Sequence, residues 1–234
     1  MEGWVELSAG LATRLTLRPD GKGHRFVWRV LRVALDKVAV QAAASPEGQM
    51  MAFNLQRQWL FAVNGGYFET DRKPSGLLQF GKTKLGSYRK GGGTGLLVID
   101  GGRARLLDAS RGATLGGEPE LALQSGPRLV ETDGKLGITS DPKPPAARSA
   151  VCLRQGGHRL DFVITWDPRN PAEGPSLLQL AEWLSKPDED NPTGCEGALN
   201  LDGGPSAALV VPGRPELAHS ARAPVPFALV GRSR

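Results

Sequence analysis

The sequence contains few cysteine, histidine and aromatic residues, and these shortages exclude several classes of protein. Of its 234 residues, two are cysteine, three are histidine, and 6% are aromatic. Cys152 and Cys195 are too few for a disulfide-rich scaffold or a cysteine-based zinc site, and His24, His158 and His219 lack the spacing of metal ligands. We therefore predict no metal site and no cofactor, while a requirement for a divalent metal is left open. The two cysteines form one bridge in an oxidising compartment or remain two buried thiols.

Long apolar runs are also missing. No window of the sequence approaches the ~18 uninterrupted apolar residues of a membrane-spanning helix, so no such helix is expected. The first residues, Met1–Glu6, lack the basic segment followed by an apolar one that is typical of a signal peptide.

The charge balance favours an anionic partner but not a nucleic acid. The net charge is +5 and the isoelectric point is about 9.5. Lysine and arginine are scattered, and aromatic residues do not interleave with them along the chain, as stacking platforms for single strands require. A small anionic substrate is therefore favoured, and a basic surface without a ligand is the alternative.

Glycine and proline are plentiful and indicate many short elements. The chain has 31 glycines and 18 prolines, and such turn-rich chains favour strands over helical bundles. With no repeat and no linker, the sequence predicts a single α+β domain over residues 1–234, with a strand-rich mixed sheet core and a few packed helices. Short apolar runs bounded by turn residues predict strands within 25–44 and at 60–63, 96–99, 162–164 and 197–201.

Two helices are expected. Ser45 followed by Pro46 resembles a helix start, with a helix continuing toward Gln58. Ser176 and Gln179 form a capping box, and it opens a helix whose buried face has helical spacing. That face consists of Leu177, Leu180, Ala181 and Leu184.

One apparent nucleotide-binding motif is rejected on physical grounds. The segment 76–83 satisfies the G-x-x-x-x-G-K-[ST] expression, but a phosphate-binding loop must be followed by a helix. The glycine-rich sequence after Thr83 cannot sustain one. A hairpin with Gly81 and Lys82 in its turn is predicted instead. A serine-hydrolase triad is also a poor fit, because no G-x-S-x-G elbow occurs.

Two segments share one layout and suggest a site. Residues 61–66 and 199–204 are apolar strands that end in a polar residue and a Gly-Gly pair. Glycine pairs allow close approach to a ligand, and free N–H groups in such turns bind anions. Asn64 and Asp202 at the strand ends are therefore expected to project into a pocket. Arg148, at the start of a third apolar run, is a candidate for gripping phosphate or carboxylate.

Taken together, these segments resemble the phosphodiester glycosidase family. That family includes the catalytic domain of the lysosomal uncovering enzyme and exported bacterial proteins linked to exopolysaccharide. The resemblance runs over about residues 30–230, and the sequence departs from the family pattern where Pro205 replaces a third glycine and Ala207 a second serine. The motifs that carry it are Asn64-Gly65-Gly66-Tyr67-Phe68, Gln124-Ser125-Gly126-Pro127-Arg128-Leu129, Arg148-Ser149-Ala150 and Asn200-Leu201-Asp202-Gly203-Gly204.

The resemblance implies a hydrolase that cleaves the glycosidic bond of a sugar joined to a phosphodiester, such as an N-acetylglucosamine-phosphate diester, on cell-envelope or exopolysaccharide glycans. Asp202 is the expected catalytic carboxylate and Arg148 the cation on phosphate, with Glu69 and Asp71 as reserve carboxylates. The expected substrate-binding residues are Asn64, Gly65, Gly66, Tyr67, Phe68, Gln124, Ser125, Ser149, Gly203, Gly204 and Ser206.

Two other functions remain as alternatives. One is a non-catalytic module that binds anionic polysaccharide or assists exopolysaccharide synthesis, and the other is a phosphodiesterase that leaves phosphate on the sugar. The resemblance also implies export to the periplasm or the cell surface, which makes a Cys152–Cys195 bridge possible. The expected partner is a sugar phosphodiester or an anionic glycan, with no nucleic acid, and the oligomeric state is not predicted.

Overall fold

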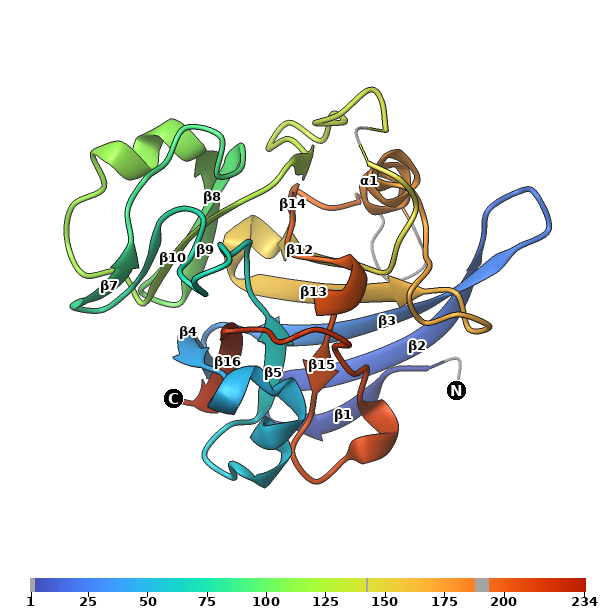
Figure 1. Ribbon diagram of the computed structural model, residues 1–234, viewed down its shortest axis with the longest axis horizontal. Helices are drawn as coiled ribbons and strands as arrows, with labels where there is room; N and C mark the ends of the chain where they lie inside the picture. The colour runs from blue at the N-terminus through green and yellow to red at the C-terminus, as the bar shows by residue number, and fades with distance from the viewer. Residues whose placement is uncertain (1–2, 142, 188–193) are drawn as a thin grey trace.

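The fold is dominated by strands. The computed structural model describes residues 3–141, 143–187 and 194–234, and in this part of the chain sixteen strands accompany one α-helix and six short 3-10 helices. The strand-rich prediction is confirmed, although the proportion of helix is lower than an α+β class suggests. In Figure 1 the strands gather into separate sheets, and α1 lies beside only one of them.

The largest sheet has seven strands. Its spatial order is β1-β2-β3-β13-β12-β14-β11. In chain order the strands are β1 (Val5–Ser8), β2 (Leu11–Pro19), β3 (Arg25–Ala34), β11 (Arg128–Val130), β12 (Arg148–Arg154), β13 (Arg159–Trp166) and β14 (Gly197–Asn200).

Two smaller sheets complete the fold. One has the order β7-β6-β10-β8-β9 and the other β15-β5-β16-β4. Their strands are β4 (Val38–Ala44), β5 (Phe61–Asn64), β6 (Leu78–Phe80), β7 (Thr83–Gly86), β8 (Gly95–Asp100), β9 (Arg103–Asp108), β10 (Leu121–Ser125), β15 (Leu209–Val210) and β16 (Phe227–Ser233). The hairpin predicted around Gly81 and Lys82 is confirmed by β6 and β7.

The expectation of mixed pairing is wrong for the described strands, because neighbouring strands pair antiparallel in all three sheets. Parallel neighbours require a long crossover, usually a helix. Helix α1 (Leu177–Ser185) provides one between β13 and β14, but β12 lies between these two strands in the sheet.

One hydrophobic core joins the three sheets. It contains Leu31, Phe162 and Leu199 from the seven-stranded sheet, Phe61 from the four-stranded sheet and Leu97 from the five-stranded sheet, all fully buried. Because side chains alternate between the faces of a strand, the other face of the seven-stranded sheet points away from this core.

Helix α1 covers part of that outer face. The Ser176 side chain accepts a hydrogen bond from the Gln179 N–H at 3.2 Å, which caps the helix as the sequence predicted. Leu177, Leu180, Ala181 and Leu184 are buried against β11, β12 and β14 residues in a second cluster, so the predicted buried face is also confirmed.

The helix expected after Ser45 is wrong in type. The segment forms two 3-10 helices, η1 (Pro46–Gly48) and η2 (Met50–Leu55), and the Ser45 side chain caps neither. Glu47 has a φ of 51° and Gly48 a φ of 77°, a left-handed conformation that ends a right-handed helix after one turn. The other 3-10 helices are η3 (Ala109–Ala113), η4 (Gln155–Gly157), η5 (Gly204–Ser206) and η6 (Pro215–Leu217).

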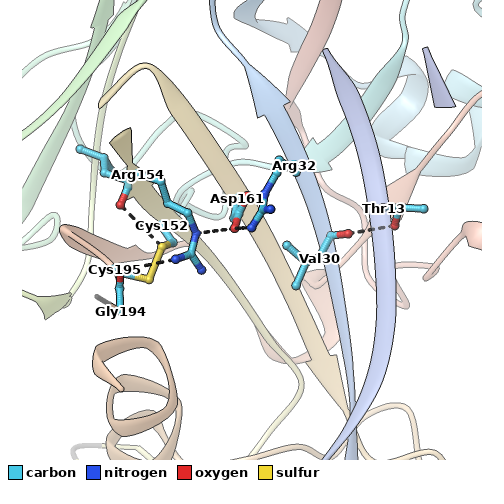
Figure 2. Close-up of polar contacts among 9 residues, drawn as sticks. Thr13, Val30, Arg32, Cys152, Arg154, Asp161, Gly194 and Cys195 are labelled. Atoms are coloured by element: carbon cyan, nitrogen blue, oxygen red, sulfur yellow. Dashed lines mark hydrogen bonds and ion pairs between the residues drawn. A yellow bond between two sulfur atoms is a disulfide. The ribbon is translucent and has the colours of Figure 1, made fainter. Parts of the chain in front are cut away.

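A disulfide joins Cys152 on β12 to Cys195, just before β14. Figure 2 shows this bridge beside Arg154, and Gly194 marks the return of the chain from the helix. Both cysteines belong to the cluster under α1, so the bridge ties the helix-bearing crossover to the sheet. The possible pairing raised by the sequence is therefore the one in the structure.

Removing this bridge is expected to lower the free energy of unfolding by about 3–4 kcal/mol. The cysteines are 43 residues apart, and loop-closure entropy for a loop of that length gives this magnitude. Urea denaturation of Cys152→Ala/Cys195→Ala measures the loss, and reduced wild-type protein should show a similar one. A double variant as stable as the oxidised wild type would contradict the prediction.

Candidate functional site

The four sequence motifs meet where strands from three sheets end. Asn64 ends β5 of the four-stranded sheet, Ser125 ends β10 of the five-stranded sheet, and Arg148 begins β12 of the seven-stranded sheet. The Leu201 N–H donates to the Ser149 carbonyl at 2.9 Å, which places Asp202 beside Arg148. The predicted convergence of Asn64, Arg148 and Asp202 is confirmed.

The Asn64 side chain connects the segments of this junction through hydrogen bonds. Its Nδ2 donates to the Asp202 carbonyl at 2.6 Å, and its Oδ1 accepts from Ser149 Oγ at 2.7 Å and from the Ala208 N–H at 3.0 Å. Asn64 is fully buried. Both ends of its amide are bonded to protein, so Asn64 positions the Asp202 segment, and the substrate contact expected from the sequence stays a prediction.

Three more expected ligand residues are bonded inside the protein. Ser149 Oγ donates to Asn64, and Ser125 Oγ donates to the Asn200 carbonyl at 2.8 Å. Gln124 Oε1 accepts the N–H groups of Leu77 and Arg89, while its Nε2 donates to the carbonyls of Arg89 and Gly93. All three side chains are buried. They hold strand ends and the 77–93 segment in place, and direct binding of substrate by these residues stays a prediction.

Three N–H groups of the Gly-Gly turns donate to acceptors within the protein. The Gly203 N–H donates to Asp202 Oδ1 and the Gly204 N–H donates to the Ala147 carbonyl. The Gly65 N–H likewise donates to the Phe227 carbonyl. A Cβ on Gly203 would lie 2.8 Å from the Ala147 oxygen, and one on Gly66 would lie 3.1 Å from the Gln124 oxygen. The expected anion nest is therefore occupied by protein acceptors.

Asp202, which follows β14, is partly exposed. Burial raises the pKa of Asp202, while hydrogen bonds from the Ser206 side chain and the Gly203 N–H, and the nearby Lys143 ammonium, act in the opposite direction. A carboxylate with a raised pKa is a better proton acceptor than an ordinary aspartate. Ser206 was expected to bind substrate, and in the structure its side chain is a hydrogen-bond partner of the Asp202 carboxylate.

Tyr67 lies beside Asp202. Its hydroxyl donates to the Gly126 carbonyl at 2.6 Å and accepts from Asn200 Nδ2 at 2.9 Å. Burial, followed by the charge of Asp202, raises the pKa of Tyr67 to about 12, so it is neutral at physiological pH. Its neighbour Phe68 forms a β-bridge with Pro74.

Lys143 is the cation whose charge acts on Asp202, and Arg148 lies close enough to act on Tyr67. Arg148 is 5% exposed, and its guanidinium donates to the carbonyls of Pro175 at 3.1 Å and Pro144 at 2.6 Å. Burial lowers the pKa of Arg148. Lys143 is exposed, and its ammonium lies 4.8 Å from the centre of the Tyr67 ring. Arg148 fixes the two loops around the site, whereas Lys143 is open to a ligand.

The reserve carboxylates are surface charges. Glu69 forms an ion pair with Arg89 at 2.6 Å and Asp71 one with Lys73 at 2.8 Å. No cluster of three or more histidine, cysteine, aspartate or glutamate side chains suited to a metal occurs in the described ranges.

Comparison with known proteins supplies the family. A profile of the phosphodiester glycosidase family matches residues 58–230, which is most of the chain and includes all four motifs. The chain belongs to the phosphodiester glycosidase family. None of the curated proteins matches it.

Solved structures agree with this fold. The chain is similar to the auto-inhibited catalytic domain of zebrafish N-acetylglucosamine-1-phosphodiester alpha-N-acetylglucosaminidase, with a TM-score of 0.65 and 19% identity over 97% of this chain and 84% of that one. It is also similar to a hypothetical protein from Synechocystis, with a TM-score of 0.60 and 13% identity over 99% of this chain and 63% of that one. A putative exported protein from Burkholderia pseudomallei has a TM-score of 0.50 and 14% identity over 89% and 74% of the two chains. At these identities the likeness shows the fold.

The site contains two residues that the sequence analysis did not single out. Lys143 lies between motifs, and no pattern in the sequence distinguishes it. Asn200 belongs to one of the four motifs but was given no role, although its side chain donates hydrogen bonds to the Tyr67 hydroxyl and the Gly126 carbonyl.

The sequence departs from the family pattern at two positions, Pro205 and Ala207. Pro205 lies near the start of η5, and Ala207 is buried. A proline is tolerated there because the first N–H groups of a helix need no internal partner.

Proposed function

We propose that this phosphodiester glycosidase hydrolyses the bond between the anomeric carbon of a sugar and the oxygen of a phosphodiester, with Asp202 as the general base. The observation that carries this proposal is the Asp202 carboxylate. It is partly exposed, its pKa is raised by burial, and the Lys143 ammonium lies near it where the family motifs meet.

In the proposed step, Asp202 takes a proton from a water molecule as the water oxygen attacks the anomeric carbon. The bond from that carbon to the bridging oxygen breaks, and its electron pair stays on the phosphate. The products are a free sugar and a phosphate monoester. Ordinary glycosidases need a second carboxylic acid to protonate the leaving group. A phosphate monoester, with a second pKa of about 6, leaves without that help.

The cations of the site suit the phosphate part of the proposed substrate. As the bond breaks, negative charge accumulates on the phosphate, and a fixed positive charge close to it stabilises the transition state. Lys143 is the exposed cation for this role, and the buried Arg148 adds positive charge from beneath and holds the Pro144 and Pro175 loops. Tyr67 remains protonated, so it does not add a second negative charge. Gly65, Gly66, Gly203 and Gly204 shape the floor of the site.

We further propose that the whole chain acts as one exported domain. The Cys152–Cys195 disulfide supports an oxidising compartment, and one structural relative is described as a putative exported protein. Among the described residues, no helix is long and apolar enough to cross a membrane.

The reaction is tested with an N-acetylglucosamine 1-(methyl phosphate) diester in water enriched in ¹⁸O. Cleavage of the carbon–oxygen bond yields methyl phosphate without the label, because the water oxygen is transferred to the sugar. Mass spectrometry of the methyl phosphate reads this directly. Labelled phosphate, or a sugar that retains phosphate, would show that a phosphorus–oxygen bond breaks and would reject the glycosidase assignment in favour of a phosphodiesterase.

A non-catalytic protein that binds anionic polysaccharide or assists exopolysaccharide synthesis gives a different result in the same experiment. Such a protein releases no product from any sugar diester, yet its melting temperature rises when the ligand is present. That combination would replace the catalytic proposal with the non-catalytic one.

A further inference from the structure

One buried arginine outside the Asp202 site has no direct partner for its charge. Arg29 lies in the middle of β3 and is only 6% exposed. Its Nε atom is fully buried and has no hydrogen-bond acceptor in the described part of the chain. No ion pair among the described residues includes Arg29. Buried charges are normally paired, because removing an ion from water is costly, so this donor is suited to an acceptor from outside the chain.

Arg29 lies at the edge of the main core. Side chains alternate along β3, so Arg29 shares the face of Leu31, which belongs to that core. On the neighbouring strand β13, Ile164 is paired with Arg29 and Trp166 with Val27. Trp166 is therefore the diagonal neighbour of Arg29 on the same face, at a distance of about 7–8 Å between backbones.

His219 packs against the Trp166 ring. The two ring centres are 4.2 Å apart and the rings are inclined by 33°. His219 is 7% exposed, and its backbone is bridged to Leu209 of β15. Burial, followed by the charges of Arg222 and Arg29, lowers the pKa of His219 to about 4. The ring is therefore neutral at physiological pH, has one N–H donor, and lies within reach of both arginine charges.

The third basic group is attached to the turn that carries Asp202. Arg222 is exposed, and its backbone N–H donates to the Pro205 carbonyl at 2.7 Å. The Ala223 N–H donates to the same oxygen at 3.1 Å. Pro205 belongs to η5, the 3-10 helix that follows Asp202. We refer to Arg29, His219 and Arg222 together as the basic niche.

The carboxylate that acts on this niche is already engaged. Among the described residues, Glu216 of η6 is the acidic group whose charge affects Arg29. It is exposed, and it forms an ion pair with Arg214 at 2.6 Å. The hydrogen bond from Arg214 is also the main reason why the pKa of Glu216 is lowered. Glu216 therefore balances Arg214 and leaves the buried guanidinium of Arg29 without a direct partner.

We propose that the basic niche binds a phosphate group, either free in solution or carried by the substrate. A guanidinium pairs with an oxyanion through two parallel N–H groups, and such a pair supplies the acceptor that the Arg29 Nε lacks. The His219 N–H and the Arg222 guanidinium are two further donors, from a different segment of the chain. A phosphate monoester has three terminal oxygens for these three groups, whereas a carboxylate has only two.

Binding is tested through the histidine. The probe is inorganic phosphate, with sodium chloride of equal ionic strength as the reference, and the His219 ring is titrated by NMR. Bound phosphate should raise the pKa of His219 from about 4 by about 1–3 pH units, because a nearby opposite charge favours the protonated imidazole. The resonances of His158, which is exposed, should be the same in phosphate and chloride. At about ten times the dissociation constant, phosphate should raise the melting temperature by about 3–6 °C.

The decisive variant is Arg29→Met, which keeps the length of the side chain and removes its charge. It should lose both responses to phosphate. The matched control is Arg25→Met, which removes the same charge from an exposed position at the start of β3 and should respond like the wild type. No effect of phosphate on wild-type His219, or an equal response in Arg29→Met, would overturn the proposal. If Arg29→Met does not fold, Arg222→Ala should weaken phosphate binding about tenfold, and unchanged binding would then reject the niche.

Kinetics distinguish the two sources of the phosphate group. The N-acetylglucosamine 1-(methyl phosphate) diester is compared with a diester whose alcohol carries a second phosphate. If the substrate fills the basic niche, the second diester should have a KM about tenfold lower, and Arg29→Met should remove the difference. Equal KM values together with the NMR response assign the niche to a free phosphate ion. This comparison rests on the proposed function, whereas the NMR titration needs no turnover, so failure of the niche and failure of the glycosidase proposal give different results.

Discussion

Replacing Asp202 with asparagine is expected to lower turnover of a sugar phosphodiester by about 10²–10⁴-fold, the range contributed by a general base. Asparagine has the same shape and still accepts the Gly203 N–H through Oδ1, so the turn is retained. Because burial already disfavours the charged carboxylate, loss of that charge should not destabilise the protein at neutral pH. Steady-state kinetics and thermal unfolding measure the two effects.

The pH profile provides the control for this prediction. Asp202 acts as a base only when ionised, and its raised pKa means that acidification protonates it at a higher pH than an ordinary aspartate. Turnover of the wild type should therefore begin to fall at a correspondingly higher pH, and the residual activity of Asp202→Asn should lack this limb. Unchanged turnover in the variant would remove Asp202 from the mechanism.

The change Asn64→Leu is expected to reduce the free energy of unfolding by about 3–5 kcal/mol. Leucine has a similar size but no polar atoms. It leaves Ser149 Oγ, the Ala208 N–H and the Asp202 carbonyl without their partner in a buried junction, and each unsatisfied buried group costs about 1–3 kcal/mol. Urea denaturation measures the loss.

Asn54→Leu is the matched control for this substitution. Asn54 is half-buried and makes one hydrogen bond, accepting the Gly213 N–H at 3.1 Å, so its replacement should cost about 0.5–1.5 kcal/mol. If the two leucine variants were equally stable, Asn64 would not hold the junction together.

Local sequence signals predicted local structure well. Ser176 and Gln179 marked the start of α1, and Gly81 with Lys82 marked a hairpin turn, because caps and turns depend on a few adjacent residues. Ser45 and Pro46 failed as a helix signal, since Glu47 and Gly48 adopt a left-handed conformation that a capping pattern does not predict.

The site could be located from the sequence, but the roles of its residues could not. Strand ends marked by Asn64 and Asp202 predicted the convergence. The hydrogen-bond partners of Asn64, Ser149 and Ser125 lie on other strands, so a polar residue that looked available to a ligand was already bonded.

The junction around Asn64 also bears on how the chain folds. Asn64 bonds to residues 85, 138 and 144 positions further along the sequence. Contacts of such long range require closure of large loops, and chains dominated by them fold slowly. Nearly the whole chain must therefore be synthesised and paired before Asp202 reaches its place, so catalytic competence should be among the last properties to appear during refolding. Recovery of far-UV circular dichroism is expected to precede recovery of turnover.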